Sequence, residues 1–280
     1  MAIDRIQLQR FELKYLIRQE IALAVRDFVR SYLELDEYGA SHSDFSYPVH
    51  SLYLDSDAMT TYWHTINGNK NRFKLRMRFY GEDRSLPVYC EIKRRMNEAI
   101  LKQRGAVRRD AVDRLLAGQM PLRDEILSDD PRQVTSVQRF CQLLNEIQAR
   151  PKAHVAYLRE AWLSRGSNSA RVTMDRNVRC EAEPTGRFCT EFRNPVDVFG
   201  SQVVLELKFT GRFPDWCREM VRVFGLTQCS AAKYVDGVVL IGEQKMAAFL
   251  AQNPQSRENA ETRRNLLRKK TGVLGIPATA

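Results

Sequence analysis

Residues 72–80 hold the side chains with the clearest chemical potential in this sequence. Read with the two-residue period of a β-strand, they put only apolar side chains on one face. The opposite face carries Arg72, Lys74, Arg76 and Arg78. Arginine can grip two phosphate oxygens at once, and lysine acts as a point charge. The strand could therefore bind a chain of phosphates, although a single strand of this kind could equally turn its charges to water.

The same alternation recurs along the chain. This repetition favours charged strand faces that together enclose one site over charged faces that each simply meet water. Strands are predicted at residues 7–17, 49–55, 72–80, 88–95, 100–107, 154–164, 170–181 and 203–209. Besides those of residues 72–80, the charged faces of these strands hold Arg10, Lys14, Lys93, Lys102, Arg104, Arg159, Arg171 and Lys208, with Glu12, Glu91 and Glu206 among them.

Apolar residues at helical spacing predict helices at residues 18–33 and 214–224, and a helical insertion at about residues 108–150. Charged strand faces cannot pack on one another dry, because a buried unpaired charge costs several kcal/mol. We therefore expect an α+β fold in which an antiparallel eight-stranded β-barrel has a charged lumen and an apolar outer face covered by helices. Such a lumen would exclude duplex nucleic acid and admit a linear chain of phosphates.

Composition narrows the class of protein. The 280 residues carry a net charge of +10, which suggests an anionic partner. Six cysteines without C-x-x-C spacing indicate reduced core thiols, and four scattered histidines do not suggest a metal site. The sequence lacks a long apolar run and a signal-peptide pattern, so we expect a soluble, cytoplasmic protein. We expect one domain over residues 1–245, followed by a basic polar tail at 246–280.

Several short motifs together resemble the VTC domain, the polyphosphate polymerase domain of the triphosphate tunnel metalloenzyme superfamily. The resemblance covers roughly residues 5 to 240, and it rests on the joint order and spacing of the motifs. They are Arg10-Phe-Glu-Leu-Lys-Tyr15, Lys74-Leu-Arg-Met-Arg-Phe-Tyr80, Glu91-Ile-Lys93, Lys102-Gln-Arg104, Tyr157-Leu-Arg159, Arg171-Val-Thr-Met-Asp175, Leu205-Glu-Leu-Lys208 and Lys233-Tyr234.

The resemblance implies transfer of the γ-phosphate of ATP to a growing polyphosphate chain inside the tunnel, with Mn²⁺ or Mg²⁺ as cofactor. It implies metal ligation by Glu206 and Glu12. The implied catalytic residues are Lys14, Arg76, Arg78, Lys93, Lys102, Arg159 and Lys208. The implied substrate-binding residues are Arg10, Lys74, Arg104, Tyr157, Arg171, Ser230 and Lys233. ATP and polyphosphate would be the partners, and nucleic acid would not.

Two departures from the superfamily pattern are visible. The opening E-x-E-x-K of the superfamily is here Arg10-x-Glu12-x-Lys14, which resembles the VTC branch and removes one carboxylate. The usual S-K-Y is here Cys229-Ser-Ala-Ala-Lys-Tyr234, which separates the serine from the lysine. The sequence shows neither the inositol-phosphate sensor domain of fungal relatives nor a transmembrane segment, so regulation and membrane coupling would come from partners, for example a membrane protein.

Alternatives remain open at this level. The chain could be a tunnel-type triphosphatase that gives phosphate to water, or a non-catalytic polyphosphate-binding accessory protein. Lys14, Arg76, Arg78 and Lys93 could form plain ion pairs with Glu12 and Glu91, and Glu206 could pair only with a lumen cation such as Lys208. The tyrosines could be wall residues, and the basic tail a solvated segment or weakly held helix. A P-loop enzyme is disfavoured, because G-x-x-x-x-G-K-[ST] is absent.

Overall fold

A large antiparallel sheet forms the centre of the computed structural model, which describes residues 10–97, 99–166, 169–247 and 254–271. The strands that make up this sheet are β1 (Arg10–Ile17), β2 (Glu34–Leu35), β3 (Tyr47–Asp55), β4 (Asn71–Phe79), β5 (Val88–Met96), β6 (Ala99–Val107), β7 (Arg150–Leu163), β8 (Ala170–Ala182), β9 (Val196–Asp197) and β10 (Val203–Thr210). The eight predicted strands correspond to β1, β3, β4, β5, β6, β7, β8 and β10. Residues 7–9 of the first predicted strand lie outside the described residues.

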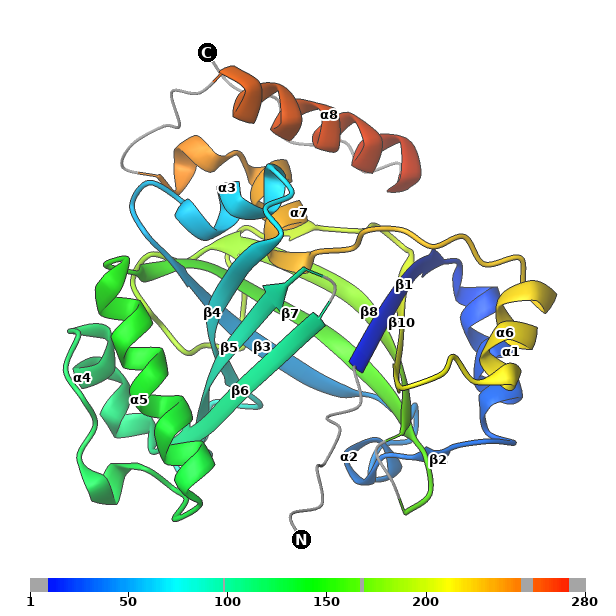
Figure 1. Ribbon diagram of the computed structural model, residues 1–280, viewed down its shortest axis with the longest axis horizontal. Helices are drawn as coiled ribbons and strands as arrows, with labels where there is room; N and C mark the ends of the chain where they lie inside the picture. The colour runs from blue at the N-terminus through cyan, green and yellow to red at the C-terminus, as the bar shows by residue number, and fades with distance from the viewer. Residues whose placement is uncertain (1–9, 98, 167–168, 248–253, 272–280) are drawn as a thin grey trace, which may run out of the picture.

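Helices surround the sheet (Figure 1). They are α1 (Gln19–Val29), α2 (Glu37–Ala40), α3 (Thr60–Ile66), α4 (Val112–Leu116), α5 (Pro131–Glu146), α6 (Asp215–Val223), α7 (Lys233–Ile241) and α8 (Pro254–Thr271), with 3₁₀ turns at Arg109–Ala111, Arg123–Glu125 and Glu243–Lys245. The predicted insertion corresponds to α4, α5 and two of these turns. None of the helices in the described ranges is long and apolar enough to cross a membrane.

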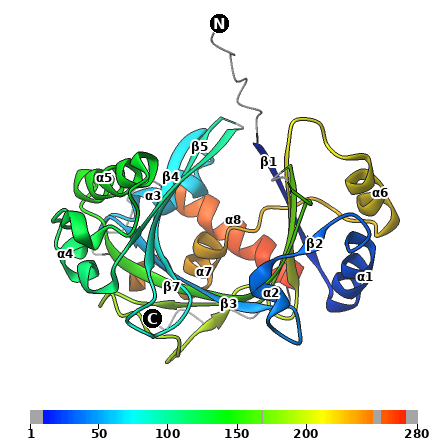
Figure 2. The same cartoon turned by 90° about the horizontal axis from the view of Figure 1, so that it is seen from below.

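The sheet curls, but it does not close into a hydrogen-bonded barrel. Its long strands follow the order β1-β10-β8-β7-β3-β4-β5-β6, and the end strands β1 and β6 approach each other (Figure 2). Across the described residues, no backbone pairing joins those two strands. A charged contact spans this gap instead, since Lys93 Nζ of β5, the strand next to β6, lies 2.8 Å from Glu12 Oε1 of β1. The prediction of a closed barrel is therefore not confirmed.

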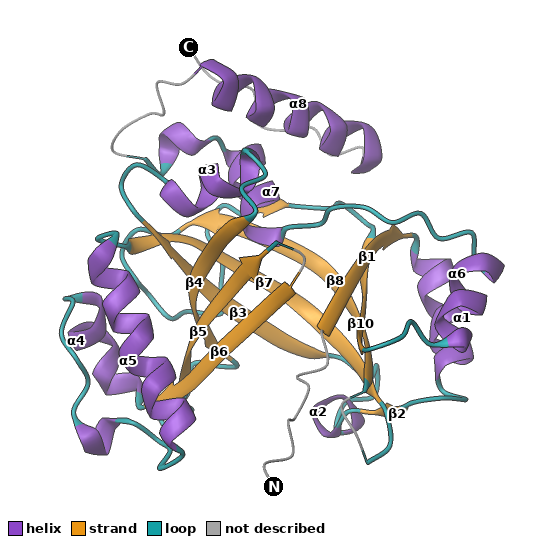
Figure 3. Cartoon of the chain, viewed as in Figure 1, coloured by secondary structure: helices purple, strands orange, loops and turns teal. Residues whose placement is uncertain are grey.

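The convex face of the curled sheet is apolar, as the alternation predicts. Leu75, Met77 and Phe79 of β4 are almost fully buried in a cluster with residues of α4 and α5. A second cluster lies between β1, β8 and β10 on one side and α1 and α6 on the other (Figure 3). Burial of apolar surface is worth roughly 25 cal/mol per Å², so both layers contribute substantially to stability.

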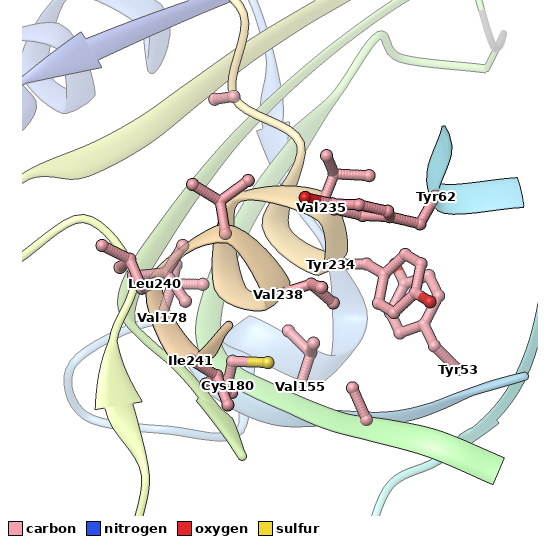
Figure 4. Close-up of a cluster of buried hydrophobic side chains, with 14 of the residues drawn as sticks. Tyr53, Tyr62, Val155, Val178, Cys180, Tyr234, Val235, Val238, Leu240 and Ile241 are labelled. Carbon is pink, nitrogen blue, oxygen red and sulfur yellow. The ribbon is translucent and has the colours of Figure 1, made fainter. Parts of the chain in front are cut away.

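Helix α7 packs at one end of the concave face. All its residues are buried, and Tyr234 stacks on Tyr53 of β3 with ring centroids 4.7 Å apart (Figure 4). The Tyr234 hydroxyl donates to Asp55 Oδ2 at 3.0 Å. Asp55 also accepts the backbone N–H groups of Thr61 and Tyr62 at 2.9 Å each, and so satisfies two free donors in the first turn of α3.

The C-terminal segment contains a helix. Within the stretch predicted to be a basic polar tail, α8 packs beside α7 and α3. Its Ala260 and Leu267 are buried in the same cluster as α7. Arg263 Nε donates to Asp236 Oδ1 of α7 at 2.6 Å. The alternative of a fully solvated tail is therefore wrong for Pro254–Thr271, because apolar contacts and an ion pair hold this helix.

Candidate functional site

The charged face of β4 points into the curve of the sheet. Arg78 Nη2 donates to the hydroxyl of Tyr157 at 3.0 Å. Arg76 Nη1 donates to the hydroxyl of Tyr53 at 3.0 Å. Tyr157 lies on β7, which is separated from β4 by β3. Side chains of strands that are not neighbours can meet only on the concave face, so both arginines lie inside the curve as predicted.

Glu91 on β5 is the centre of a cluster of cations from the two neighbouring strands, β4 and β6. Its carboxylate lies 2.7 Å from Arg76, 3.9 Å from Arg78, 2.7 Å from Lys102 and 3.4 Å from Arg104. Burial alone would raise the pKa of Glu91, but the arginines and Lys102 hold this pKa well below its usual value. One carboxylate therefore holds four cations in place and neutralises only one of their charges.

Asp175 on β8 holds a second pair of cations. Arg159 donates to its two oxygens at 2.7 and 2.8 Å, and Lys233 of α7 lies 2.7 Å from Oδ2. Asp175 is completely buried. Its burial opposes ionisation, yet Arg159 and Lys233 keep the pKa of Asp175 far below its usual value. Lys233 also lies over the ring of Tyr157, 4.8 Å from the centroid.

A third cluster joins β1, β5 and β10. Lys14 lies 3.3 Å from Glu12 and 3.0 Å from Glu206, while Lys208 lies 2.6 Å from Glu206 and Lys93 lies 2.8 Å from Glu12. The pKa of Glu12 is lowered to about 2, because the attraction of the lysines outweighs burial and the charge of Glu206. Burial is the main reason why the pKa of Lys208 falls to about 8.

Glu12 and Glu206 are the residues that could hold a divalent cation. Both carboxylates approach the same Lys14 ammonium, and Thr173 Oγ1, opposite Glu206 in the register, is buried without a hydrogen-bond partner. The described residues contain no group of three His, Cys, Asp or Glu side chains able to hold a metal. Mg²⁺ and similar ions take one or two carboxylates and fill their remaining positions with phosphate oxygens and water. This sparse oxygen set fits such an ion once phosphate is present.

The remaining predicted site residues do not form one further cluster. Lys74 lies on the charged face of β4, and Arg171 on β8 contacts Asp36 at 3.5 Å. Ser230 is exposed, and its hydroxyl accepts a hydrogen bond from Arg263 of α8 at 3.2 Å. Arg10 begins β1, and its side chain lies outside the described residues.

From the sequence, Glu91 is named only as an alternative ion-pair partner, while Asp175 and Tyr53 are assigned no role. Glu91 and Asp175 alternate with the cations of their own strands, so the two-residue period could have identified them as the residues that hold the cations. Tyr53 had no such signal, because the predicted strand at residues 49–55 is mostly apolar. Its place under Arg76 depends on the pairing of β3 with β4.

The family model described as VTC domain matches residues 9–241. A search of curated proteins gives no match. Among solved structures, the PH1819 protein from Pyrococcus horikoshii OT3 is similar with 12% identity and a TM-score of 0.40, covering 81% of this chain and 96% of that one. A candidate adenylate cyclase from Bacillus halodurans is similar with 10% identity and a TM-score of 0.44, covering 80% and 96%.

Proposed function

This chain belongs to the VTC domain family, and from that membership and its charged concave face we propose that it is a polyphosphate polymerase. The enzyme would transfer the γ-phosphate of ATP to the end of an inorganic polyphosphate chain, with Mn²⁺ or Mg²⁺ as cofactor. The observation that supports this most directly is the convergence of cations from separate strands and from α7 on three buried carboxylates. At each of these carboxylates, the positive charge of the surrounding cations exceeds the single negative charge of the carboxylate.

Such an arrangement suits phosphoryl transfer, because positioning and charge stabilisation supply most of the catalysis in that reaction. Arg76, Arg78 and Arg159 are held by Glu91 and Asp175 before any ligand arrives, so little reorganisation is needed on binding. These guanidinium groups would take phosphate oxygens in pairs. Lys233, held by Asp175, would add a point charge beside them.

In the proposed reaction, an oxygen of the terminal phosphate of the chain attacks the γ-phosphorus of ATP. The bond from that phosphorus to the β–γ bridging oxygen breaks, and ADP leaves. A divalent ion bound by Glu206 and Glu12 would supply charge neutralisation at the phosphate oxygens. Lys14, Lys93 and Lys208 hold these two carboxylates ionised and oriented.

The decisive experiment is incubation of the purified protein with ATP and Mn²⁺, followed by analysis of the phosphate products. Long polyphosphate that accumulates together with ADP supports the proposal. Free phosphate without polymer would contradict it and indicate a triphosphatase. If the protein formed neither product but still bound polyphosphate, it would be an accessory binding protein.

A further inference from the structure

The β4–β5 pair places like charges directly opposite one another at one end of the concave face. Arg72 is the register partner of Arg95, and Lys74 is the partner of Lys93. Like charges in directly opposed positions destabilise a sheet. Of these four residues, Lys93 is compensated by Glu12 at 2.8 Å. The other three therefore need another explanation.

Arg72, Lys74 and Arg95 have no carboxylate partner among the residues that the structure describes. Arg72 donates to the backbone oxygen of Asn69, and Arg95 Nε donates to that of Asn97 at 2.9 Å. These bonds hold both guanidinium groups without neutralising them. The contrast with the clusters at Glu91 and Asp175 is clear, because there each cation has a carboxylate within 4 Å.

Helix α8 brings a further arginine to this end of the sheet. Asn259 Nδ2 of α8 lies 3.4 Å from Asn67 Oδ1, in the turn that precedes β4. Arg263, one helical turn later, is held by Asp236 and by Ser230. Burial lowers the pKa of Lys74 well below its usual value; Lys93, Lys14 and Arg263 add to that effect, and Asp236 opposes it. A bound anion at this place would favour the charged form of Lys74.

We propose that Arg72, Lys74 and Arg95, with Arg263 beside them, form a second polyanion subsite, which holds phosphates of the chain beyond those of the triphosphate. This inference rests on the proposed function, because it assigns the chain and the triphosphate to different ends of one charged face. Arg263 lies beyond the family match, which ends at residue 241. The subsite therefore combines strands of the family domain with a helix that follows it. A chain of phosphates supplies the negative charge that the register of β4 and β5 lacks.

The test compares the affinities of tripolyphosphate and of a polyphosphate of about a hundred units in the wild type, Arg72→Gln/Arg95→Gln and the control Arg212→Ala/Arg218→Ala. The control removes the same charge from exposed positions on or next to α6. We expect Arg72→Gln/Arg95→Gln to lose at least tenfold in affinity for the long chain and less than twofold for tripolyphosphate. The control should stay within twofold for both ligands.

The ligand-free melting temperature is a second measurement. It should stay the same or rise in Arg72→Gln/Arg95→Gln, because a repulsive pair is removed. Three results would each overturn the subsite. Arg72→Gln/Arg95→Gln could lose affinity equally for the two ligands, it could lose no affinity for the long chain, or the control could lose as much affinity as this variant. Failure of the proposed function is a separate result. A wild type that makes no polyphosphate could still lose long-chain affinity in Arg72→Gln/Arg95→Gln. Conversely, a wild type that does make polyphosphate could show no such loss in this variant.

Discussion

At the scale of single residues, the ion pairs of the concave face are compatible with phosphate binding. Lys14, Arg76, Arg78 and Lys93 do contact Glu12 or Glu91, as the plain ion-pair alternative supposed. A carboxylate shared by several cations leaves a net positive charge, however, and it keeps each cation in a fixed position. The roles of these residues in binding or catalysis stay predictions, and they can be tested one by one.

Glu206→Gln keeps the size of the side chain and removes its charge. We expect metal-dependent polyphosphate synthesis to fall about a hundredfold, because loss of a metal carboxylate costs several kcal/mol of transition-state stabilisation. Activity is measured across a Mn²⁺ titration, and circular dichroism checks the fold. Glu219→Gln on the exposed face of α6 is the matched control. Near-normal turnover of Glu206→Gln would show that Glu206 is not the metal ligand.

The lowered pKa of Lys208 predicts that binding of a phosphate chain takes up protons to an extent that depends on pH. In the free protein, burial lowers its pKa to about 8, so at pH 8 about half of the molecules carry a neutral Lys208. A bound phosphate chain favours the charged lysine and raises this pKa, so binding should take up about half a proton at pH 8. At pH 6.5 the lysine is already protonated, and the uptake should vanish.

Calorimetry in two buffers of different ionisation enthalpy measures this uptake. Lys208→Met provides the reference, since it leaves the titration of the phosphate itself unchanged. If wild type and variant took up the same number of protons at pH 8, Lys208 would not face the bound anion.

At the scale of elements, the alternation of side chains was sufficient to predict the strands but not their closure. Residues 72–80 follow a period of two so regularly that the sequence predicts both faces of β4 correctly. Closure depends on how the two end strands, β1 and β6, meet, and contacts across that gap, such as Lys93 of β5 with Glu12 of β1, join segments far apart in the chain. The place of α7 was equally unpredictable, because its stacking on Tyr53 joins segments far apart in the chain.

The position of α7 predicts the effect of one methyl group. A Cβ on Gly237 would lie 2.5 Å from Cys180 Sγ and 2.6 Å from Cys180 Cβ on β8. Gly237→Ala should therefore push α7 away from β8, destabilise the protein by roughly 1–3 kcal/mol, and move Lys233 away from Asp175. Both the melting temperature and the affinity for tripolyphosphate should fall.

Gly105→Ala is the control for that experiment. There a Cβ would lie 2.4 Å from Val137 of α5, on the convex side of the sheet. We expect a similar loss of stability with little change in tripolyphosphate affinity. Equal losses of affinity in the two variants would mean that general destabilisation, and not the position of α7, governs binding.

At the scale of the whole molecule, the question is where the net charge of +10 acts. Part of it lies on exposed surface and on α8, whose last turn carries Arg268, Lys269 and Lys270. Another part lies inside the curve of the sheet, where Arg78 and Arg159 are less than a tenth exposed. Exposed charges farther apart than about 8 Å are screened at physiological ionic strength, whereas partly buried ones are screened much less. Salt therefore distinguishes the two populations.

Tripolyphosphate should raise the melting temperature of the wild type even at moderate salt, because a ligand that binds the folded state stabilises it by mass action. Arg76→Ala or Lys93→Ala should remove most of this rise, since each takes away a cation of the concave face. Neutralising Arg268, Lys269 and Lys270 together removes more charge but should leave the rise almost intact. Melting curves with and without ligand over a salt series give the comparison. If the triple variant lost as much stabilisation as the strand variants, a surface patch and not the concave face would bind the anion.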